Sequence, residues 1–406
     1  MRPEFELNSV ELFTGAGGLA LGSELAGFRT KAVVERDKWA CSTLRSNVER
    51  GHPLVSSWNI HETDVREFDF TSIGESIDLV SGGPPCQPFS LGGKHRGNQD
   101  SRDMFPSAVS AVRQLRPKAF VFENVKGLTR NSFTNYFNYI ILQLTFPETV
   151  KKPNESWQDH LSRLEKIKTS SRSTGLTYSV VFRVLNAADF GVPQRRYRVF
   201  LVGFRNDLNA DWSFPEATHS LESLLKDQSE SGCYWERHGL DSNKIATNVR
   251  QYRSNLNEKL LTRKPWKTVR DALFDLSDPK PAKCAVHNDH VFQSGAKPYP
   301  GHTGSTLDLP AKTLKAGDHG VPGGENMIDF GDGQYRYFTV REAARLQTFP
   351  DTYRFHGSWT ETMRQLGNAV PVRLSRIIMA SVAEKLILLE EKNQSKLIKQ
   401  VSREVN

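Results

Sequence analysis

The sequence predicts an α/β fold in which a doubly wound, mostly parallel sheet carries a smaller and irregular second domain. Short apolar runs alternate with stretches of helical periodicity through the N-terminal half, and this alternation is typical of parallel sheets. Turns rich in glycine and proline separate the two kinds of segment. After residue 206 Gly, Pro, Asn and His become frequent and the periodicity fades, so the second domain is expected to begin there.

The elements of the sheet domain follow from the positions of the apolar runs and of the turns between them. In chain order they are strand 9–13, helix 19–26, strand 31–35, helix 38–48, strand 77–81, helix 107–115, strand 119–122 and two antiparallel strands over 178–185 and 198–204. The third strand runs into Gly82, Gly83, Pro84 and Pro85, where no helix can continue. Because ligands of such sheets bind beyond the carboxyl ends of the strands, these turns are the expected site.

The remaining segments are more polar. Residues 145–174, with a helical piece at 157–167, are interpreted as an insertion. Helices are expected over 339–347 and 374–389, and the polar C-terminal end is expected to fray.

The composition excludes several classes of protein. With 37% hydrophobic and 25% charged residues, the chain of 406 residues has the balance of a globular protein, neither disordered nor fibrous. No apolar run approaches the roughly 18 residues of a membrane helix, and the N-terminus has no secretory signal pattern, so a cytoplasmic protein is expected. The net charge of +8 suits a polyanionic partner.

One segment concentrates this positive charge. Residues 246–270 hold seven Lys or Arg against the single acid Glu258. Such a run is either a solvated face or a surface that contacts phosphates, and in a basic chain we favour phosphate contact.

The four cysteines give no pattern for a metal or a disulfide. They stand at positions 41, 86, 233 and 284, without a C-x-x-C pair or a histidine at metal spacing. A buried cysteine is usually inert, and this reading fits Cys41. Cys86 differs because prolines on both sides hold it in a loop at a strand end, where functional side chains collect. A thiolate there suits a poor electrophile such as C6 of cytosine.

The first turn and the acids that follow it describe a pocket for an adenosine-containing cofactor. Segment 13–18 holds three glycines, which let the backbone approach a ligand at a helix N-terminus, although the spacing is not the G-x-G-x-x-G of dinucleotide binders. Glu35 can accept from two ribose hydroxyls and Asp64 from an adenine amine. Each acid taken alone is more often an ordinary surface residue. The order of the glycine turn, Glu35 and Asp64 along the chain is what predicts a pocket for an adenosine group.

Further charged side chains are expected beside Cys86. Glu123 comes directly after a buried strand, where a protonated carboxyl can donate to a ring nitrogen. Arg196 and Arg198 alternate where another strand begins, so both side chains should point to one face and meet the same phosphate or base. An ordinary exposed basic strand is the alternative.

Taken together, the motifs resemble those of the bacterial DNA (cytosine-5) methyltransferases over about residues 9–370. They are Phe13-x-Gly15-x-Gly17-Gly18, Pro84-Pro85-Cys86-Gln87-Pro88-Phe89-Ser90, Glu123-Asn124-Val125, Gln194-x-Arg196-x-Arg198, Arg341-Glu342-Ala343-Ala344-Arg345-Leu346-Gln347 followed by Phe349-Pro350, and Gly367-Asn368-Ala369-Val370-Pro371. The resemblance implies a Rossmann-like sheet that binds S-adenosylmethionine, and a reaction on a cytosine flipped out of duplex DNA.

The resemblance also implies residue roles. Cys86 would add to C6, Glu123 would bind the N3 and N4 edge, and Arg198, supported by Arg196, would steady the O2 side; C5 would then take the methyl group. The cofactor site would be lined by Phe13, Gly15, Ala16, Gly17, Gly18, Glu35, Asp64, Val65, Met104, Asn368 and Val370. The motif around Met104, residues 100–105, is one residue shorter than the family pattern.

By the same resemblance, residues 1–206, completed by 355–406, would form the catalytic and cofactor-binding domain, and 207–354 the target-recognition domain and hinge. Contacts with DNA are expected from the loop after Cys86 and from a Thr-Leu pair: Gln87, Ser90, Gly92, Thr313 and Leu314. Residues 317–324 would form a recognition loop, and 341–347 would organise this region without doing chemistry. The partner would be double-stranded DNA, and the chain a monomer without metal or membrane contact.

Three other readings explain less of the sequence. A transfer-RNA methyltransferase of the same family would carry a Cys-Phe-Thr signature, which is absent. A catalytically inactive DNA-binding homologue would have lost the cysteine, the glutamate or the glycines, and a dinucleotide-dependent oxidoreductase would not explain Cys86. We expect a bacterial or phage-type enzyme. It is either the modification half of a restriction system, sharing its site with a cognate restriction endonuclease without binding it, or a solitary methylase.

Overall fold

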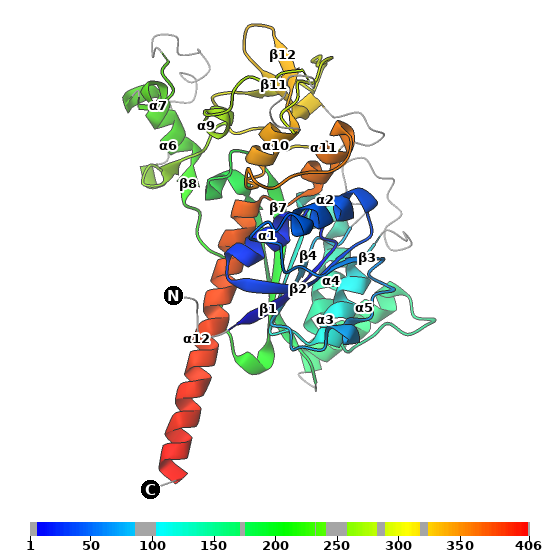
Figure 1. Cartoon of the computed structure of the whole chain (residues 1–406). Helices are drawn as coiled ribbons and strands as arrows, with labels where there is room; N and C mark the ends of the chain where they lie inside the picture. Colours follow the sequence, from blue (N-terminus) through cyan, green and yellow to red (C-terminus); the bar gives the residue numbers. More distant parts are fainter. Residues whose placement is uncertain are drawn as a thin grey trace.

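A seven-stranded sheet with the order β3-β2-β1-β4-β5-β7-β6 forms the centre of the molecule (Figure 1). The structure is a computed structural model that describes residues 6–85, 103–170, 175–231, 233–240, 258–281, 289–316 and 324–404. The strands are β1 (Leu7–Leu12), β2 (Phe28–Glu35), β3 (Ile60–Glu62), β4 (Leu79–Gly82), β5 (Ala119–Val125), β6 (Tyr178–Asn186) and β7 (Tyr197–Arg205). Strand β7 runs antiparallel to β5 and β6, and the other ladders are parallel, so the predicted mostly parallel sheet is confirmed.

Helices cover both faces of this sheet. Successive strand residues point to opposite faces, so Val33 packs in a core cluster with α1 and α2, while Val34 packs in one with α3, α4 and α5. The C-terminal helix α12 covers β1, β4, β5 and β7 on the face of α1. Their bounds are α1 (Gly18–Leu25), α2 (Lys38–Glu49), α3 (Phe105–Leu115), α4 (Thr134–Thr145), α5 (Trp157–Ser170) and α12 (Val372–Glu404).

The second region is built from short elements. They are β8 (His219–Ser220), α6 (Leu221–Lys226), α7 (Cys233–Arg237), β9 (Lys264–Pro265), α9 (Val269–Leu273), β10 (Ser305–Thr306), β11 (Met327–Asp329), β12 (Tyr335–Tyr337) and α10 (Val340–Leu346). Helix α11 (Trp359–Asn368) follows this region and contacts both α10 and α2. This region shares a core cluster with the sheet domain, because Leu314, Phe338 and Val340 pack with Ala16 and Val33.

Short helical turns connect several of these elements. They are the 3₁₀ helices η1 (Phe70–Ile73), η3 (Lys126–Thr129), η4 (Asn131–Phe133), η5 (Ala187–Phe190), η6 (Asn206–Leu208), η10 (Glu258–Leu260) and η12 (Gly324–Asn326), and the π-helical turn η7 (Asp227–Ser231). In the part of the chain that the structure describes, no helix is both long and apolar enough to cross a membrane.

Two of the element boundaries that differ from the sequence predictions are those of β5 and α12. Strand β5 continues through Val125, because its antiparallel partner β7 pairs with it as far as Arg198, so Glu123 lies inside the strand and not after it. The prediction of a frayed C-terminus is wrong: α12 runs to Glu404 and extends beyond the sheet (Figure 1). Residues 372–404 contain neither glycine nor proline, so nothing in the sequence stops the helix. The helical piece predicted within 145–174 is α5.

Candidate active site

The glycine turn after β1 lies where the strand order of the sheet reverses. Strands β2 and β4 flank β1 on opposite sides, and Leu12 is paired with Gly82 at the end of β4. Phe13, Gly15 and Gly17 have φ values of 54°, 55° and 89°, a left-handed backbone that favours glycine. In doubly wound sheets the point of reversal is where ligands bind, so the predicted cofactor turn has the expected position.

The carboxylate of Glu35 organises this turn from the end of β2. One oxygen accepts a hydrogen bond from the backbone N–H of Gly15 at 2.7 Å. The other accepts from the N–H groups of Arg36 and Asp37, each at 2.8 Å. A Cβ at Gly15 would meet no atom within 4 Å, so the backbone here is open to a ligand. A carboxylate acceptor beside an open glycine backbone fits the ribose end of an adenosine group.

The last motif of the chain returns to the same turn. A Cβ at Gly18 would lie 2.3 Å from the carbonyl oxygen of Val370, so only glycine permits this contact. Asn368 is exposed at the end of α11, close in sequence to the buried Val370. The hydroxyl of the buried Tyr353 donates to the carbonyl of Ala16 at 2.9 Å and so holds the turn in place. Residues of the first and last motifs therefore meet.

Asp64 lies after β3 and is held by two arginines. Arg66 donates to both carboxylate oxygens, at 2.8 and 2.7 Å, and Arg36 donates at 3.3 Å. These contacts, the hydrogen bond from Arg66 first, hold the pKa of Asp64 well below its usual range, so the group is an anionic acceptor. An adenine amine would share this carboxylate with the arginines.

The predicted apolar contacts of the cofactor fall into one cluster. Val65 and Met104 are both buried there, and Phe13 packs against the same cluster at its edge. With the carboxylates of Glu35 and Asp64 as acceptors, they make a set of polar and apolar contacts that fits an adenosyl group with an apolar flank. Among the described residues no group of His, Cys, Asp and Glu side chains is arranged to hold a metal ion.

Glu123 and Arg198 form the most enclosed ion pair of the predicted site. The Glu123 carboxylate lies 2.7 Å from Nε of Arg198, and their side chains are 9% and 13% exposed. Burial raises the pKa of Glu123 more than the two arginines 196 and 198 lower it. Burial also lowers the pKa of the Arg198 guanidinium. The carboxyl therefore holds its proton to higher pH than an exposed glutamate, as a donor to a ring nitrogen requires.

The cysteine motif begins beside this pair. The side-chain amide of Asn124 donates to the carbonyl of Pro84 at 2.8 Å, and a Cβ at Gly83 would lie 3.4 Å from the Glu123 carboxylate. The backbone N–H of Met104 donates to the carbonyl of Pro85 at 3.1 Å, which joins the two ends of the segment between them. The predicted nucleophile Cys86 and the DNA contacts Gln87, Ser90 and Gly92 lie in that segment, outside the described residues.

The expectation that Arg196 and Arg198 meet one ligand needs correction. Arg196 is fully buried, and its guanidinium donates to the carbonyls of Leu314 at 3.1 Å and Gly367 at 2.7 Å. A buried guanidinium needs acceptors, and here backbone carbonyls from two distant segments supply them. Arg198 alone is paired with Glu123.

The predicted Thr-Leu pair is divided in the same way. The Thr313 hydroxyl, half-buried, donates to the carbonyl of Arg195 at 2.7 Å. The Leu314 side chain is 1% exposed within a core cluster, so its predicted contact with DNA is not available to that side chain in this structure. A leucine between a polar threonine and a lysine gives no local sign of which way it points. The predicted recognition loop lies almost wholly outside the described residues, which resume at 324.

One arginine of the basic run 246–270 is paired with a carboxylate of the protein. Arg270 is bound by both carboxylate oxygens of Asp308, at 2.6 and 3.1 Å. Lys264 and Lys267 are exposed, and residues 246–257 lie outside the described part of the chain. Because Arg270 is already paired with Asp308, it is removed from the predicted phosphate contacts.

Sequence reasoning missed three side chains that shape the site. They are Asn124, which holds Pro84; Tyr353, which holds Ala16; and Gln347, whose amide donates to the carbonyls of Leu366 at 2.5 Å and Ala369 at 3.2 Å. Asn124 and Gln347 belong to motifs that the sequence analysis identified, so their place in those motifs could have marked them as site residues. Nothing near Tyr353 in the sequence marks it.

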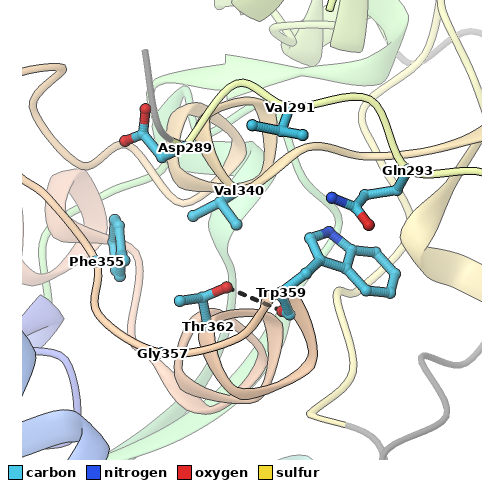
Figure 2. A pocket seen from close by; sticks show the side chains of 8 residues that line it. All are labelled: Asp289, Val291, Gln293, Val340, Phe355, Gly357, Trp359 and Thr362. Atoms are coloured by element: carbon cyan, nitrogen blue, oxygen red, sulfur yellow. Dashed lines mark hydrogen bonds between the residues drawn. The ribbon is translucent and has the colours of Figure 1, made fainter. Parts of the chain in front are cut away.

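The two described cavities lie apart from these residues. One, of about 170 Å³, lies between the segment 289–293 and helices α10 and α11, with Asp289, Val340 and Trp359 among its walls (Figure 2). The other, of about 530 Å³, is lined by residues such as Lys267, Phe274 and Arg345. Lys267 of the basic run lines the larger cavity, but none of the predicted catalytic or cofactor residues that the structure describes lines either one, so the site is defined by the strand ends and the motifs there.

Comparisons with known proteins bear on the family and the fold of the chain. The family model of the C-5 cytosine-specific DNA methylases matches residues 7–146 and 154–384. The short gap falls inside the segment interpreted as an insertion. Two solved structures share the fold. A prophage-encoded E. coli protein assigned as a DNA modification methyltransferase has a TM-score of 0.55 and 22% identity, and covers 94% of this chain and 99% of its own. The S. pombe Dnmt2 methyltransferase has a TM-score of 0.52 and 17% identity, over 94% and 98%.

Curated relatives match over nearly the whole length. The Type II methyltransferase M.PspPI of a Psychrobacter species is 30% identical over 397 residues, which are 95% of this chain and 81% of that protein. The Type II methyltransferase M.Eco47II of Escherichia coli is 32% identical over 384 residues, 93% and 79%. The chain therefore belongs to the C-5 cytosine-specific DNA methylase family, the DNA (cytosine-5) methyltransferases.

Proposed function

We propose that the protein methylates carbon 5 of a cytosine flipped out of a specific short duplex sequence, with S-adenosylmethionine as the methyl donor and Cys86 as the nucleophile. The observation that supports this best is the buried Glu123 and Arg198 pair beside the Pro84 anchor of the cysteine motif. It offers a proton donor and a cation at one point, close to Pro84, which stands two residues before Cys86. We propose the division into residues 1–206 with 355–406, for chemistry, and 207–354, for recognition and hinge.

Several residues would hold the cofactor. Glu35 faces the glycine turn as an acceptor for hydroxyls, Asp64 is an anionic acceptor, and Val65 and Met104 offer apolar contact. The Val370 backbone contacts Gly18 of the turn, and Asn368 lies two residues before Val370. When bound, S-adenosylmethionine supplies an electrophilic methyl group.

The chemistry at the base follows from the enclosed pair. The Cys86 thiolate forms a bond to C6 while the C5=C6 π pair moves toward C5, and the Glu123 carboxyl, which donates to N3, stabilises the ring in this state. Arg198 is paired with that carboxyl and steadies the O2 side of the base. Once C5 carries the methyl group, a base removes the C5 proton, its electron pair re-forms C5=C6, and the C6–S bond breaks to return the thiolate.

A labelling experiment tests the function. Incubation with unmethylated duplex DNA and methyl-labelled S-adenosylmethionine, followed by sequencing for 5-methylcytosine, should reveal label in DNA at one sequence. Transfer of label to tRNA and not to DNA would favour the tRNA methyltransferase reading, and no transfer would favour an inactive DNA-binding homologue.

A trapping experiment tests the nucleophile. A duplex with 5-fluorocytosine at the target has no removable C5 proton, so the wild type should form a covalent adduct that survives denaturation. Cys86→Ser should abolish this adduct, whereas Cys233→Ser, a control at an exposed cysteine, should retain it. An adduct that persists in Cys86→Ser contradicts the assignment.

We place the enzyme in the cytoplasm of a bacterial or phage-infected cell, as a monomer associated with the nucleoid. The relatives' designation as Type II methyltransferases supports a role as the modification half of a restriction system. A cognate endonuclease would then share its site without binding it.

A further inference from the structure

Arg196 bridges two segments that the sequence separates widely. One Nη group donates to the carbonyl of Leu314, which follows the Thr313 expected to approach DNA. The other donates at 2.7 Å to the carbonyl of Gly367, which directly precedes Asn368 of the cofactor site. One planar guanidinium therefore contacts two segments: residues 313–316, which we call the recognition segment, and residues 366–370, which we call the cofactor segment.

The backbones of these two segments also touch. A Cβ at Gly367 would lie 2.3 Å from the backbone nitrogen of Ala316 and 2.4 Å from the carbonyl carbon of Lys315. Both atoms belong to main chain, so neither can yield as a flexible side chain would. Movement of one segment toward the other must therefore displace it.

Neighbouring side chains stiffen the recognition segment on the far side of this contact. The buried Asn326 accepts from the N–H of Lys315 at 3.2 Å and donates to its carbonyl at 3.1 Å. Gln194 accepts from the N–H of Leu314 at 3.0 Å. Gln347 holds the cofactor segment through Leu366 and Ala369. Each segment is braced separately, and Arg196 is the side chain seen to bond to both.

Arg196 is an expensive residue to bury. Its Nε group has no hydrogen-bond partner in the described structure, and the whole side chain is 0% exposed. Leaving a buried donor unpaired is destabilising, and more so when the group is charged. The two charge-assisted bonds it does make are of the stronger kind and are directional. This geometry suits a rigid connection better than contact with a ligand.

We propose that Arg196 is a positioning residue that couples DNA binding to cofactor binding, so that each strengthens the other. The inference rests on the proposed function, since it takes the segment at 313–314 as the DNA side and 368–370 as the cofactor side. Coupling between two binding sites is reciprocal, so the factor by which DNA tightens cofactor binding equals the factor by which cofactor tightens DNA binding.

Calorimetric titration tests the coupling. S-adenosylhomocysteine is titrated into the full chain with and without a short duplex that carries the sequence methylated in the labelling experiment. In the wild type the duplex should increase the affinity by roughly 5- to 150-fold, the usual range for such coupling. In Arg196→Met, which removes both bonds and the buried charge while keeping the volume, this factor should fall to about 1.

A matched control and a second variant keep the test decisive. Arg205→Met removes an arginine at the far end of β7 that also donates to a backbone carbonyl, that of Arg116, and should keep the full coupling factor. Gly367→Ala forces the two segments apart while Arg196 remains, and should also reduce the factor. If Arg196→Met does not fold in thermal unfolding, Gly367→Ala decides.

The outcomes separate this inference from the proposed function. A wild type that methylates DNA but shows no coupling, or folded variants that keep it, would overturn the role of Arg196 and leave the methyltransferase standing. A wild type that transfers no methyl group to DNA would instead remove the proposed function itself.

Discussion

Glu123 and Arg198 show how single residues acquire chemistry from burial. The pair is separated by 2.7 Å and nearly closed to solvent, so the carboxyl is pulled toward protonation by desolvation and toward ionisation by the guanidinium. Desolvation prevails and the pKa of Glu123 is raised. A carboxyl that keeps its proton to higher pH than usual, beside a guanidinium, is the donor that the proposed attack at C6 of cytosine requires.

Glu123→Gln should change the pH profile of kcat/KM. The wild-type rate should fall as pH rises through the raised pKa of Glu123, because the ionised carboxylate cannot donate to N3. The amide of the variant does not titrate, so this alkaline limb should vanish while the rate drops on the order of 10²- to 10⁴-fold. Glu216→Gln, at an 83% exposed side chain, should keep the wild-type profile. An alkaline limb that survives in Glu123→Gln would assign it to another group.

At the scale of elements, β1 and β4 carry the two key turns and share a buried polar contact. Glu11 of β1 is fully enclosed and hydrogen-bonds with the hydroxyl of Ser81, one residue before the end of β4. Burial raises the pKa of Glu11 to about 8, against an ordinary 4.5, while the Ser81 bond opposes the shift. The central ladder therefore includes a carboxyl that is neutral at physiological pH.

Glu11→Gln should remove a pH dependence of folding stability. Between pH 4.5 and about 8 the folded chain keeps a proton that the unfolded chain has released. The free energy of unfolding should therefore fall as pH rises, by about 1.4 kcal/mol per pH unit across this window, and should not change from this cause below it. Denaturant unfolding at pH 5 and 8 should show Glu11→Gln gaining on the wild type at pH 8. Equal slopes for the variant, the wild type and the exposed control Glu67→Gln would contradict this.

At the scale of the whole molecule, the C-terminal helix completes a sheet that the N-terminal half begins. Helix α12 packs on α1, where the Ser375 hydroxyl donates to the carbonyl of Leu19 at 2.7 Å. A Cβ at Gly22 would lie 2.3 Å from that of Ser375, so the two helices touch. Its buried apolar residues, over 374–386, cover the strands. After Glu390, which pairs with Lys118, the helix extends beyond the sheet domain (Figure 1).

Two truncations should separate these parts of α12. Deleting residues 392–406 removes helix that extends beyond the sheet, so the thermal unfolding midpoint should shift by only a few degrees. Deleting 372–406 exposes the face of the sheet and removes buried side chains worth about 1.5–3 kcal/mol each, against a typical stability of about 5–15 kcal/mol. That chain should not unfold cooperatively. Cooperative unfolding of the shorter chain would show that 372–406 are dispensable to the fold.

The sequence by itself determined the sheet, its glycine turn and the family. The reason is that these depend on local signals: left-handed turns that favour glycine at 15 and 17, prolines around Cys86, and strand and helix periodicity. The position of Glu123 at the end of a buried strand was readable within one element, although its pairing extended the strand past it.

Only the tertiary structure decided what lies against these local features. The buried position of Leu314, the Tyr353 hydroxyl under the glycine turn and the two carbonyls that hold Arg196 depend on segments up to 337 residues apart along the chain. No periodicity or turn signal reports such a contact. The alternation of strand residues predicted that Arg196 and Arg198 lie on one face. In the folded interior, however, Arg196 donates to backbone carbonyls and Arg198 pairs with Glu123, because these are the acceptors that lie beside each of them.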